Sequence, residues 1–187
     1  MNILLFGPPG AGKGTQAKYL VKKVNGFQIS TGDILRNEIY KNSEIGKEIT
    51  NDMSNGKFVS DKIVNKLIKD IIFDTQKKNR LIFDGYPRSL SQAKDLDLFL
   101  KNSDQKIDLI FFLNVNKEII MKRIEKRKNL EKRSDDDLKT ILHRYDIYME
   151  TTKPVLEYYS KNPNFHEIDG ALEIDEITNK IDVFLGV

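Results

Sequence analysis

The chain has 187 residues, of which 39% are hydrophobic, and this length predicts one compact domain with at most a small insertion. It has no cysteine, which excludes disulfides and thiolate metal sites, and its net charge of +3 is too small to indicate nucleic-acid binding. No apolar run approaches the length of a membrane span. We therefore expect a cytoplasmic protein with neither a membrane nor a nucleic-acid partner.

The first expected element is a strand at Ile3–Phe6, followed by the glycine-rich segment GPPGAGKGT at residues 7–15. An amphipathic helix is expected to begin near Lys13, so the order is strand, glycine-rich loop and helix. Glycines tolerate positive φ angles, which lets successive backbone N–H groups surround a phosphate, and the helix N-terminus adds its dipole. The lysine adds a positive charge for the outer phosphates. This segment predicts binding of a nucleoside triphosphate.

The loop departs from the common pattern at Gly14, where most phosphate-binding loops have a serine or threonine that holds magnesium. Thr15 follows one position later, so we expect magnesium to be held largely through water and substrate oxygens. An alternative is a dinucleotide-binding fold, with Asp33 as the acid that contacts the ribose. The glycine spacing, with a lysine inside the turn, fits the phosphate loop better.

Four more apolar runs rich in β-forming residues follow, at Phe27–Ser30, Leu81–Asp84, Leu109–Val115 and Phe165–Ile168. Helical patterns separate them, which predicts a three-layer α/β/α fold with a parallel five-stranded sheet, of the P-loop NTPase type. In such sheets ligands bind at the carboxyl ends of the strands. We therefore expect the loops after the first four strands to face one site.

The segment STGDILR at residues 30–36 follows the second run. In the plainer interpretation Ser30 or Thr31 caps a helix. In the functional interpretation Thr31 lies near a base and Arg36 binds a second phosphate.

The third run, Leu81–Asp84, ends in an acid that we expect to place magnesium or its waters. Gly85 and Pro87 then predict a rigid turn that aims Arg88 over the site, where a planar guanidinium matches a phosphate. Without that aim, Arg88 would be an ordinary surface ion-pairing residue. Gln92 carries a donor and an acceptor, so it either reads a base edge or lies on the surface.

Because Arg36 and Arg88 come from different loops that face one site, the sequence predicts two phosphate sites. One lies in the glycine-rich loop and the other lies between the two arginines. Four further arginines follow, at Arg123, Arg127, Arg133 and Arg144. A phosphoryl group in transfer spreads negative charge over its oxygens. Its transfer therefore depends on positioning and on cations, and it needs no nucleophilic side chain from the protein.

The motifs GPPGAGKGT, ISTGDILR, GKFVSD, FDGYPR with Gln92 beyond it, and RSDDD followed by HRY occur in this order between residue 1 and about residue 175. Together they resemble the adenylate kinase family. The resemblance implies a reversible, magnesium-dependent reaction in which ATP and AMP give two ADP, serving adenine nucleotide homeostasis.

The resemblance also implies site residues. The implied ATP site is Gly10, Ala11, Gly12, Lys13, Gly14, Thr15, Arg123, Arg127 and Leu172. The implied AMP site is Thr31, Arg36, Lys57, Phe58, Val59, Gly85, Tyr86, Pro87, Arg88, Gln92, Arg133 and Arg144. The implied catalytic cations are Lys13, Arg88, Arg127, Arg133 and Arg144. Asp84, helped by Asp33, would orient magnesium through water.

Within the family the chain is similar to short-lid members, which are usually monomers. The resemblance implies one kinase domain, residues 1–187, with a core at 1–29, 65–126 and 134–187. A helical AMP-binding insertion would span 30–64 and a short lid 127–133. The lid lacks the glycines of short-lid relatives, and the absence of cysteine implies no zinc.

Three alternatives remain at this stage. UMP/CMP kinases resemble the chain but tend to differ at the positions of Thr31 and Gln92, which favour AMP here. A GTP-using AMP kinase is the second, because backbone groups read most of the donor base. A non-catalytic ATP-binding switch or nucleic-acid module is the third, and it would not need the Arg36–Arg88 pair.

Overall fold

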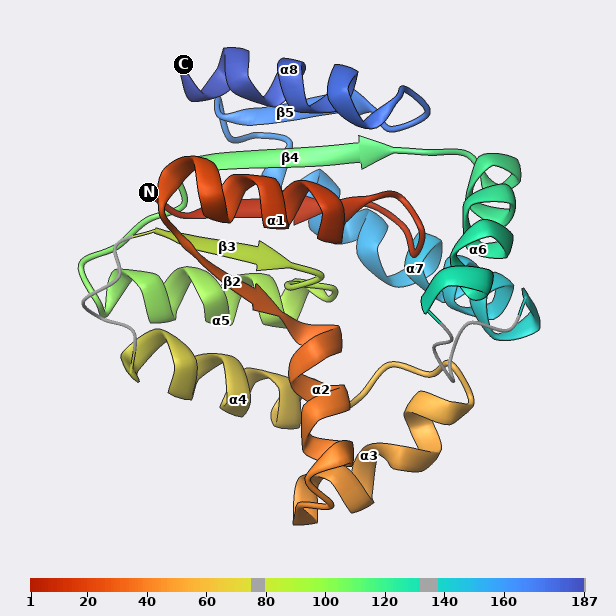
Figure 1. Cartoon of the computed structure of the whole chain (residues 1–187). Coiled ribbons are helices and arrows are strands. Elements are labelled where there is room, and N and C mark those ends of the chain that lie inside the picture. Colours follow the sequence, from red (N-terminus) through yellow and green to blue (C-terminus); the bar gives the residue numbers. More distant parts are fainter. Residues whose placement is uncertain (75–79, 132–137, 187) are drawn as a thin grey trace.

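The computed structural model describes residues 1–74, 80–131 and 138–186, and at 127–131 and 138 it describes the backbone alone. Five parallel strands form one sheet in the order β2-β3-β1-β4-β5 (Figure 1). Their bounds are β1 Ile3–Phe6, β2 Phe27–Ser30, β3 Leu81–Asp84, β4 Leu109–Asn114 and β5 Phe165–Asp169. The predicted parallel sheet is confirmed, and the strand ends differ from the expected ones by one residue at most.

Helices connect the strands and cover both faces of the sheet. Their bounds are α1 Lys13–Val24, α2 Thr31–Tyr40, α3 Glu44–Ser54, α4 Asp61–Asp74, α5 Leu90–Lys101, α6 Lys117–Glu131, α7 Leu138–Tyr159 and α8 Ile174–Leu185. Side chains of α1 and α8 pack in one hydrophobic cluster with one face of the sheet, and side chains of α4, α5 and α7 pack in a second cluster with the other. The fold is the α/β/α sandwich that the sequence predicts.

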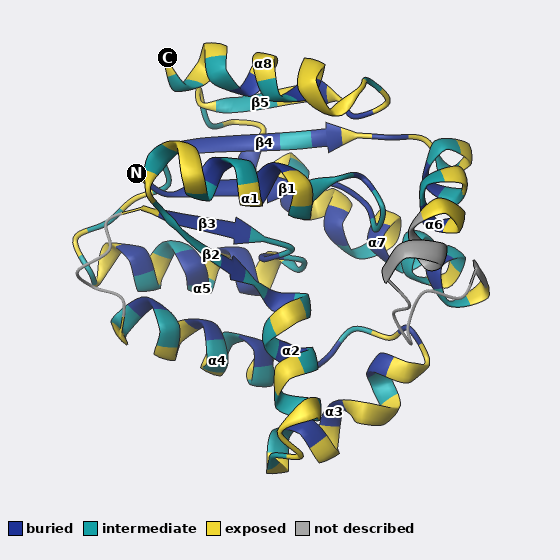
Figure 2. Cartoon of the chain, in the orientation of Figure 1, coloured by how far each residue is buried: buried dark blue, intermediate teal, exposed yellow. Residues whose placement is uncertain are grey.

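The central strand β1 shows why apolar runs give this sheet. Leu4 and Phe6 belong to one hydrophobic cluster while Ile3 and Leu5 belong to the other, because successive strand residues point to opposite faces. All four are buried (Figure 2). Full burial of such a side chain contributes about 1.5–3 kcal/mol, so the strand is a strong anchor for the loop that follows it.

Helices α2 and α3 form most of the segment 30–64 and extend beyond the sheet (Figure 1). The Ser30 hydroxyl accepts a hydrogen bond from the Asp33 N–H at 3.3 Å, which confirms Ser30 as an N-cap. The two helices cross closely at Gly46, where an added Cβ would lie 2.1 Å from the Glu38 carbonyl oxygen. Whether this segment moves as an AMP-binding unit stays a prediction.

Helix α6 is longer than the sequence suggested. The resemblance implied a short lid at 127–133, but the helix continues through Glu131. The residues up to that point include neither glycine nor proline, and lysine, leucine and glutamate are good helix formers. Most of the expected lid, residues 127–131, is therefore helical, and the rest of it lies outside the described residues. No helix in the described ranges is both long enough and apolar enough to cross a membrane.

Candidate active site

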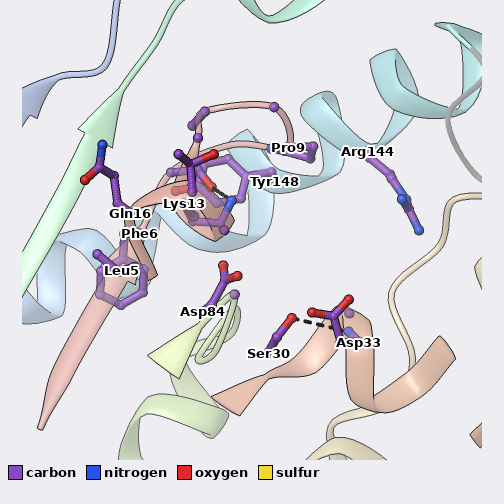
Figure 3. A pocket seen from close by; sticks show the side chains of 18 of the residues that line it. Leu5, Phe6, Pro9, Lys13, Gln16, Ser30, Asp33, Asp84, Arg144 and Tyr148 are labelled. Carbon is purple, nitrogen blue, oxygen red and sulfur yellow. Dashed lines mark hydrogen bonds between the residues drawn. The ribbon is translucent and has the colours of Figure 1, made fainter. Parts of the chain in front are cut away.

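A cavity of about 740 Å³ opens at the carboxyl ends of the central strands, where the fold predicts a ligand. Its walls come from the loops after β1, β2 and β3, from α6 and α7, and from the turn after β5. Figure 3 labels side chains from the first three of these loops and from α7. The loop after β4 was also expected here, but α6 supplies that wall instead. One cavity thus collects residues from across the chain.

The glycine-rich loop after β1 has the backbone form that a phosphate site requires. Gly10 and Gly12 have φ angles of 84° and 95°, in the left-handed region that favours glycine. Helix α1 begins at Lys13, and Gly12 has no side chain to cap it. The helix start therefore keeps backbone donors for an anion. The Lys13 Nζ donates to the carbonyl oxygens of Gly7 at 2.7 Å and Pro8 at 3.0 Å, which holds its charge over the loop.

A second cationic region faces this loop. The Arg88 Nε donates to the Gly85 carbonyl at 2.8 Å, and its guanidinium lies over the Phe58 ring, 4.8 Å from the centroid. An added Cβ on Gly85 would lie 2.9 Å from an Arg88 nitrogen, and one on Gly32 would lie 3.0 Å from an Arg36 nitrogen. Glycine at both positions leaves room for a guanidinium group beside the backbone, and the φ angle of 76° at Gly85 also favours glycine.

The arginines of this region repel one another. Burial, followed by the charge of Arg144 and with a smaller part from Arg36, lowers the pKa of Arg88 to about 10, although Asp84 and Tyr148 act in the opposite direction. Arg88 is still charged at neutral pH, but its charged form is less favoured than in water. A bound phosphate would relieve this repulsion, so the region is built for an anion.

Asp84 and Asp33 both line the cavity, as the sequence predicts for magnesium. Asp84 faces the glycine-rich loop, since an added Cβ on Gly14 would lie 3.6 Å from its Oδ2. The same oxygen accepts a hydrogen bond from the Gln28 Nε2 at 3.1 Å. Asp33 is paired with Arg36, with 2.5 Å between Oδ1 and Nη2. Carboxylate oxygens beside a phosphate loop suit a hydrated magnesium ion, so the donor chemistry of Asp84 fits the expected metal.

The expected ATP-side residues converge at Arg123. Its Nη1 donates to the Ala11 carbonyl at 3.5 Å, and its Nη2 donates to the Leu172 carbonyl at 3.2 Å. The side chain thus joins the glycine-rich loop to the turn after β5. Arg123 and the Leu172 backbone therefore form the wall of the cavity next to the glycine-rich loop.

Three expected AMP-site residues are buried beside the cavity and do not line it. The Thr31 hydroxyl donates to the Gly85 carbonyl at 2.8 Å, and the Tyr86 hydroxyl donates to the Asn65 Oδ1 at 2.8 Å. Gln92 is 4% exposed. Lys57, Phe58, Val59 and Pro87 do line the cavity. The base-reading roles of Thr31 and Gln92 stay predictions.

The Gln92 side chain makes two hydrogen bonds that the sequence did not predict. Its Oε1 accepts from the Arg88 backbone N–H at 2.8 Å, and its Nε2 donates to the Asp61 Oδ1 at 2.6 Å. The other Asp61 oxygen accepts from the Ser89 hydroxyl at 2.5 Å. Asp61 therefore supports the backbone that carries Arg88. The position of Asp61 at the end of the GKFVSD motif could have identified it as a candidate residue, but the sequence does not show which side chains it contacts.

Two expected catalytic arginines are not placed by the structure. Arg133 lies outside the described residues, and Arg127 lies on α6 but its side chain is outside the described part. By contrast, Arg144 on α7 lines the cavity. One helical turn further on, Tyr148 also lines it, and sequence reasoning missed this residue. The available signal was its spacing of four residues from Arg144, which places both on one helix face.

The chain matches known proteins over nearly its whole length. A model of the adenylate kinase family matches residues 5–164. The adenylate kinase of Pelagibacter ubique (strain HTCC1062) is 49% identical over 213 aligned positions that cover 100% of both chains. The adenylate kinase of Mycoplasma mycoides subsp. mycoides is 40% identical, with 97% of each chain covered. That of Caulobacter sp. (strain K31) is also 40% identical, with 100% of this chain and 99% of the relative covered.

Proposed function

We infer how this chain works from one premise: it belongs to the adenylate kinase family and is an enzyme, a nucleoside monophosphate kinase. Its adenylate kinase activity transfers the terminal phosphoryl group of ATP to AMP and gives two ADP. We propose that the transfer is direct and reversible, since one phosphoanhydride bond breaks as another forms. The remaining proposals concern which residues carry it.

The observation that carries this proposal is the pair of cationic regions in one cavity. The glycine-rich loop and Lys13 would hold the ATP phosphates, while Arg36, Arg88 and Arg144 would hold the AMP phosphate and the group in transfer. A phosphoryl in transfer carries charge on its equatorial oxygens, and preorganised cations stabilise it without reorganisation. From the family resemblance of the sequence, we propose that Arg127 and Arg133 also contact the group in transfer.

We propose that magnesium accompanies ATP and that Asp84, helped by Asp33, orients it through water. When bound, this ion would neutralise part of the phosphate charge. The chain has no cysteine, and among its described side chains no three His, Asp or Glu residues gather into a metal site, so we propose that it needs no zinc. We also propose that it acts as a monomer in the cytoplasm.

We propose that residues 30–64 and a short lid at 127–133 close over the nucleotides. At least 26 residues of the Pelagibacter relative have no counterpart here, because this chain supplies at most 187 of the 213 aligned positions. A lid shorter than that of this relative would account for the difference. Closure would exclude water from the phosphoryl group.

Water exclusion predicts little idle hydrolysis. Without AMP, release of phosphate from ATP should run at roughly 1% of the transfer rate or less, since water is not held where the acceptor phosphate binds. The measurement is phosphate release with and without AMP at saturating ATP. A hydrolysis rate comparable to transfer would contradict the proposed closure.

The direct test of the function follows the phosphoryl group itself. ATP labelled at its terminal phosphate is mixed with magnesium, AMP and the protein, and the products are separated over time. We expect the label in the terminal phosphate of ADP, with two ADP formed per ATP consumed. Label that appears in inorganic phosphate, or that stays in bound ATP, would instead support hydrolysis or a non-catalytic switch.

The acceptor base is proposed to be adenine, with Gln92 as a reader. Replacing Gln92 with alanine should raise the KM for AMP about tenfold and reduce the preference for AMP over UMP and CMP, because one hydrogen-bonding group is lost. The side chain also holds the Arg88 backbone, so the ratio between acceptors is the decisive quantity. An equal loss for every acceptor would show a supporting role alone.

A further inference from the structure

Tyr148 on α7 has a buried hydroxyl with no hydrogen-bond partner. The residue is only 6% exposed, and its Oη is the one buried side-chain polar atom among the described residues that lacks a partner. A buried polar group without a partner costs about 1–3 kcal/mol, so native proteins avoid such groups unless a ligand supplies the partner. The Tyr148 side chain lines the cavity described above, reaching it from α7 beside the glycine-rich loop (Figure 3).

The hydroxyl lies between the two cationic regions. Burial raises the pKa of Tyr148, while the nearby Gly7 backbone amide and the Arg88 charge act in the opposite direction, so both groups are close to the hydroxyl. Gly7 also holds Lys13 through its carbonyl. Arg144 precedes Tyr148 by four residues and Thr152 follows by four, with the Thr152 hydroxyl donating to the Arg88 carbonyl at 3.3 Å. One face of α7 therefore meets both the loop and the arginines.

The missing partner has to be an acceptor. Burial raises the Tyr148 pKa despite the cations around it, so the phenol keeps its proton at neutral pH. The Gly7 N–H is itself a donor, and lysine and arginine side chains only donate. The Gly7 carbonyl oxygen accepts from Lys13, and the Tyr148 hydroxyl has no acceptor among the described residues. A phosphate oxygen between the two regions would accept this hydrogen bond.

We propose that Tyr148 is a further catalytic residue, whose hydroxyl donates a hydrogen bond to the phosphoryl group as it passes between the two nucleotides. This inference rests on the proposed phosphoryl transfer. The bond adds a neutral donor to the cationic groups and forms no covalent intermediate. A nucleotide phosphate in the cavity would supply the acceptor that the described residues do not.

The test is Tyr148→Phe in the full chain. Removing a hydroxyl that has no partner leaves the folded state unchanged or more stable, so we expect an unchanged or higher Tm. Turnover should fall about tenfold, which matches the loss of one hydrogen bond in the transition state, while the Kd values of ATP and AMP alone change less than twofold. A structural role would not move stability and turnover in opposite directions.

Tyr159→Phe is the matched control. Tyr159 is also on α7 and is 4% exposed, but its hydroxyl donates to the Asp97 Oδ1 at 3.1 Å. This variant should lose stability and keep its turnover. Normal turnover in Tyr148→Phe, or a fall in its Tm, would overturn the inference. A wild-type protein that transfers no phosphoryl group would instead overturn the proposed function, so the two failures are distinguishable.

Discussion

Arg88→Ala is expected to lower turnover by roughly 100-fold or more, the scale of losing one preorganised charge at a transition state. The guanidinium is aimed by its bond to the Gly85 carbonyl and by the Phe58 ring, and its pKa is lowered by burial and by Arg144. A phosphate would be its natural counter-ion. The measurement is kcat and the KM for AMP in the direction of ADP formation.

The fold should survive this change. The Arg88 backbone is held by the Gln92 and Thr152 side chains, whose bonds do not involve the guanidinium. Arg80→Ala is the matched control, since Arg80 is exposed and bonds to the Val24 carbonyl away from the cavity. Near-normal turnover in Arg88→Ala would contradict the assignment of this residue.

Lys13→Ala should produce a loss of similar size, roughly 100-fold or more in kcat, because a cation at the outer phosphates disappears. The ammonium group donates to the Gly7 and Pro8 carbonyls, so the loop itself fixes its position. We expect the KM for ATP to rise as well, since the charge also contributes to binding in the ground state. Initial rates over a range of ATP concentrations separate the two effects.

Lys22→Ala is the control for this prediction, because it removes an exposed lysine from the same helix two turns further on. Its kinetics should equal those of the unchanged chain. If Lys13→Ala retained most of its turnover, the glycine-rich loop would not be the donor site.

The fold was predictable because its strands are strongly patterned. Runs such as Ile3–Phe6 are wholly apolar, as buried parallel strands require, and glycine, serine or aspartate marks most of their ends. The phosphate loop was also predictable, since the spacing of its glycines around Lys13 fits a phosphate loop better than a dinucleotide-binding turn. The extension of α6 to Glu131 was not predicted. This polar segment was expected to form the lid, and it contains neither glycine nor proline to mark where the helix ends.

The site was less predictable where side chains depend on tertiary contacts. Arg88 was expected from its turn, but the Asp61–Gln92 bond that supports it joins residues 31 positions apart. Tyr148 was missed because a tyrosine at helical spacing is usually a core residue, and its hydroxyl stands out only when its surroundings are known. Sequence spacing shows which faces residues share, whereas the partners of each polar atom require the fold.

The central claim is that one cavity holds ATP beside AMP and transfers phosphoryl directly between them. The most direct measurement is a phosphotransfer assay with ATP and magnesium in which AMP, UMP, CMP, GMP and no acceptor are offered in parallel, repeated with GTP as donor. The account predicts fast formation of ADP with AMP, slower transfer to the other acceptors and almost no reaction without an acceptor. A preference for UMP or CMP would keep the mechanism and overturn the role of the acceptor-side residues, and transfer to none of them would contradict the account.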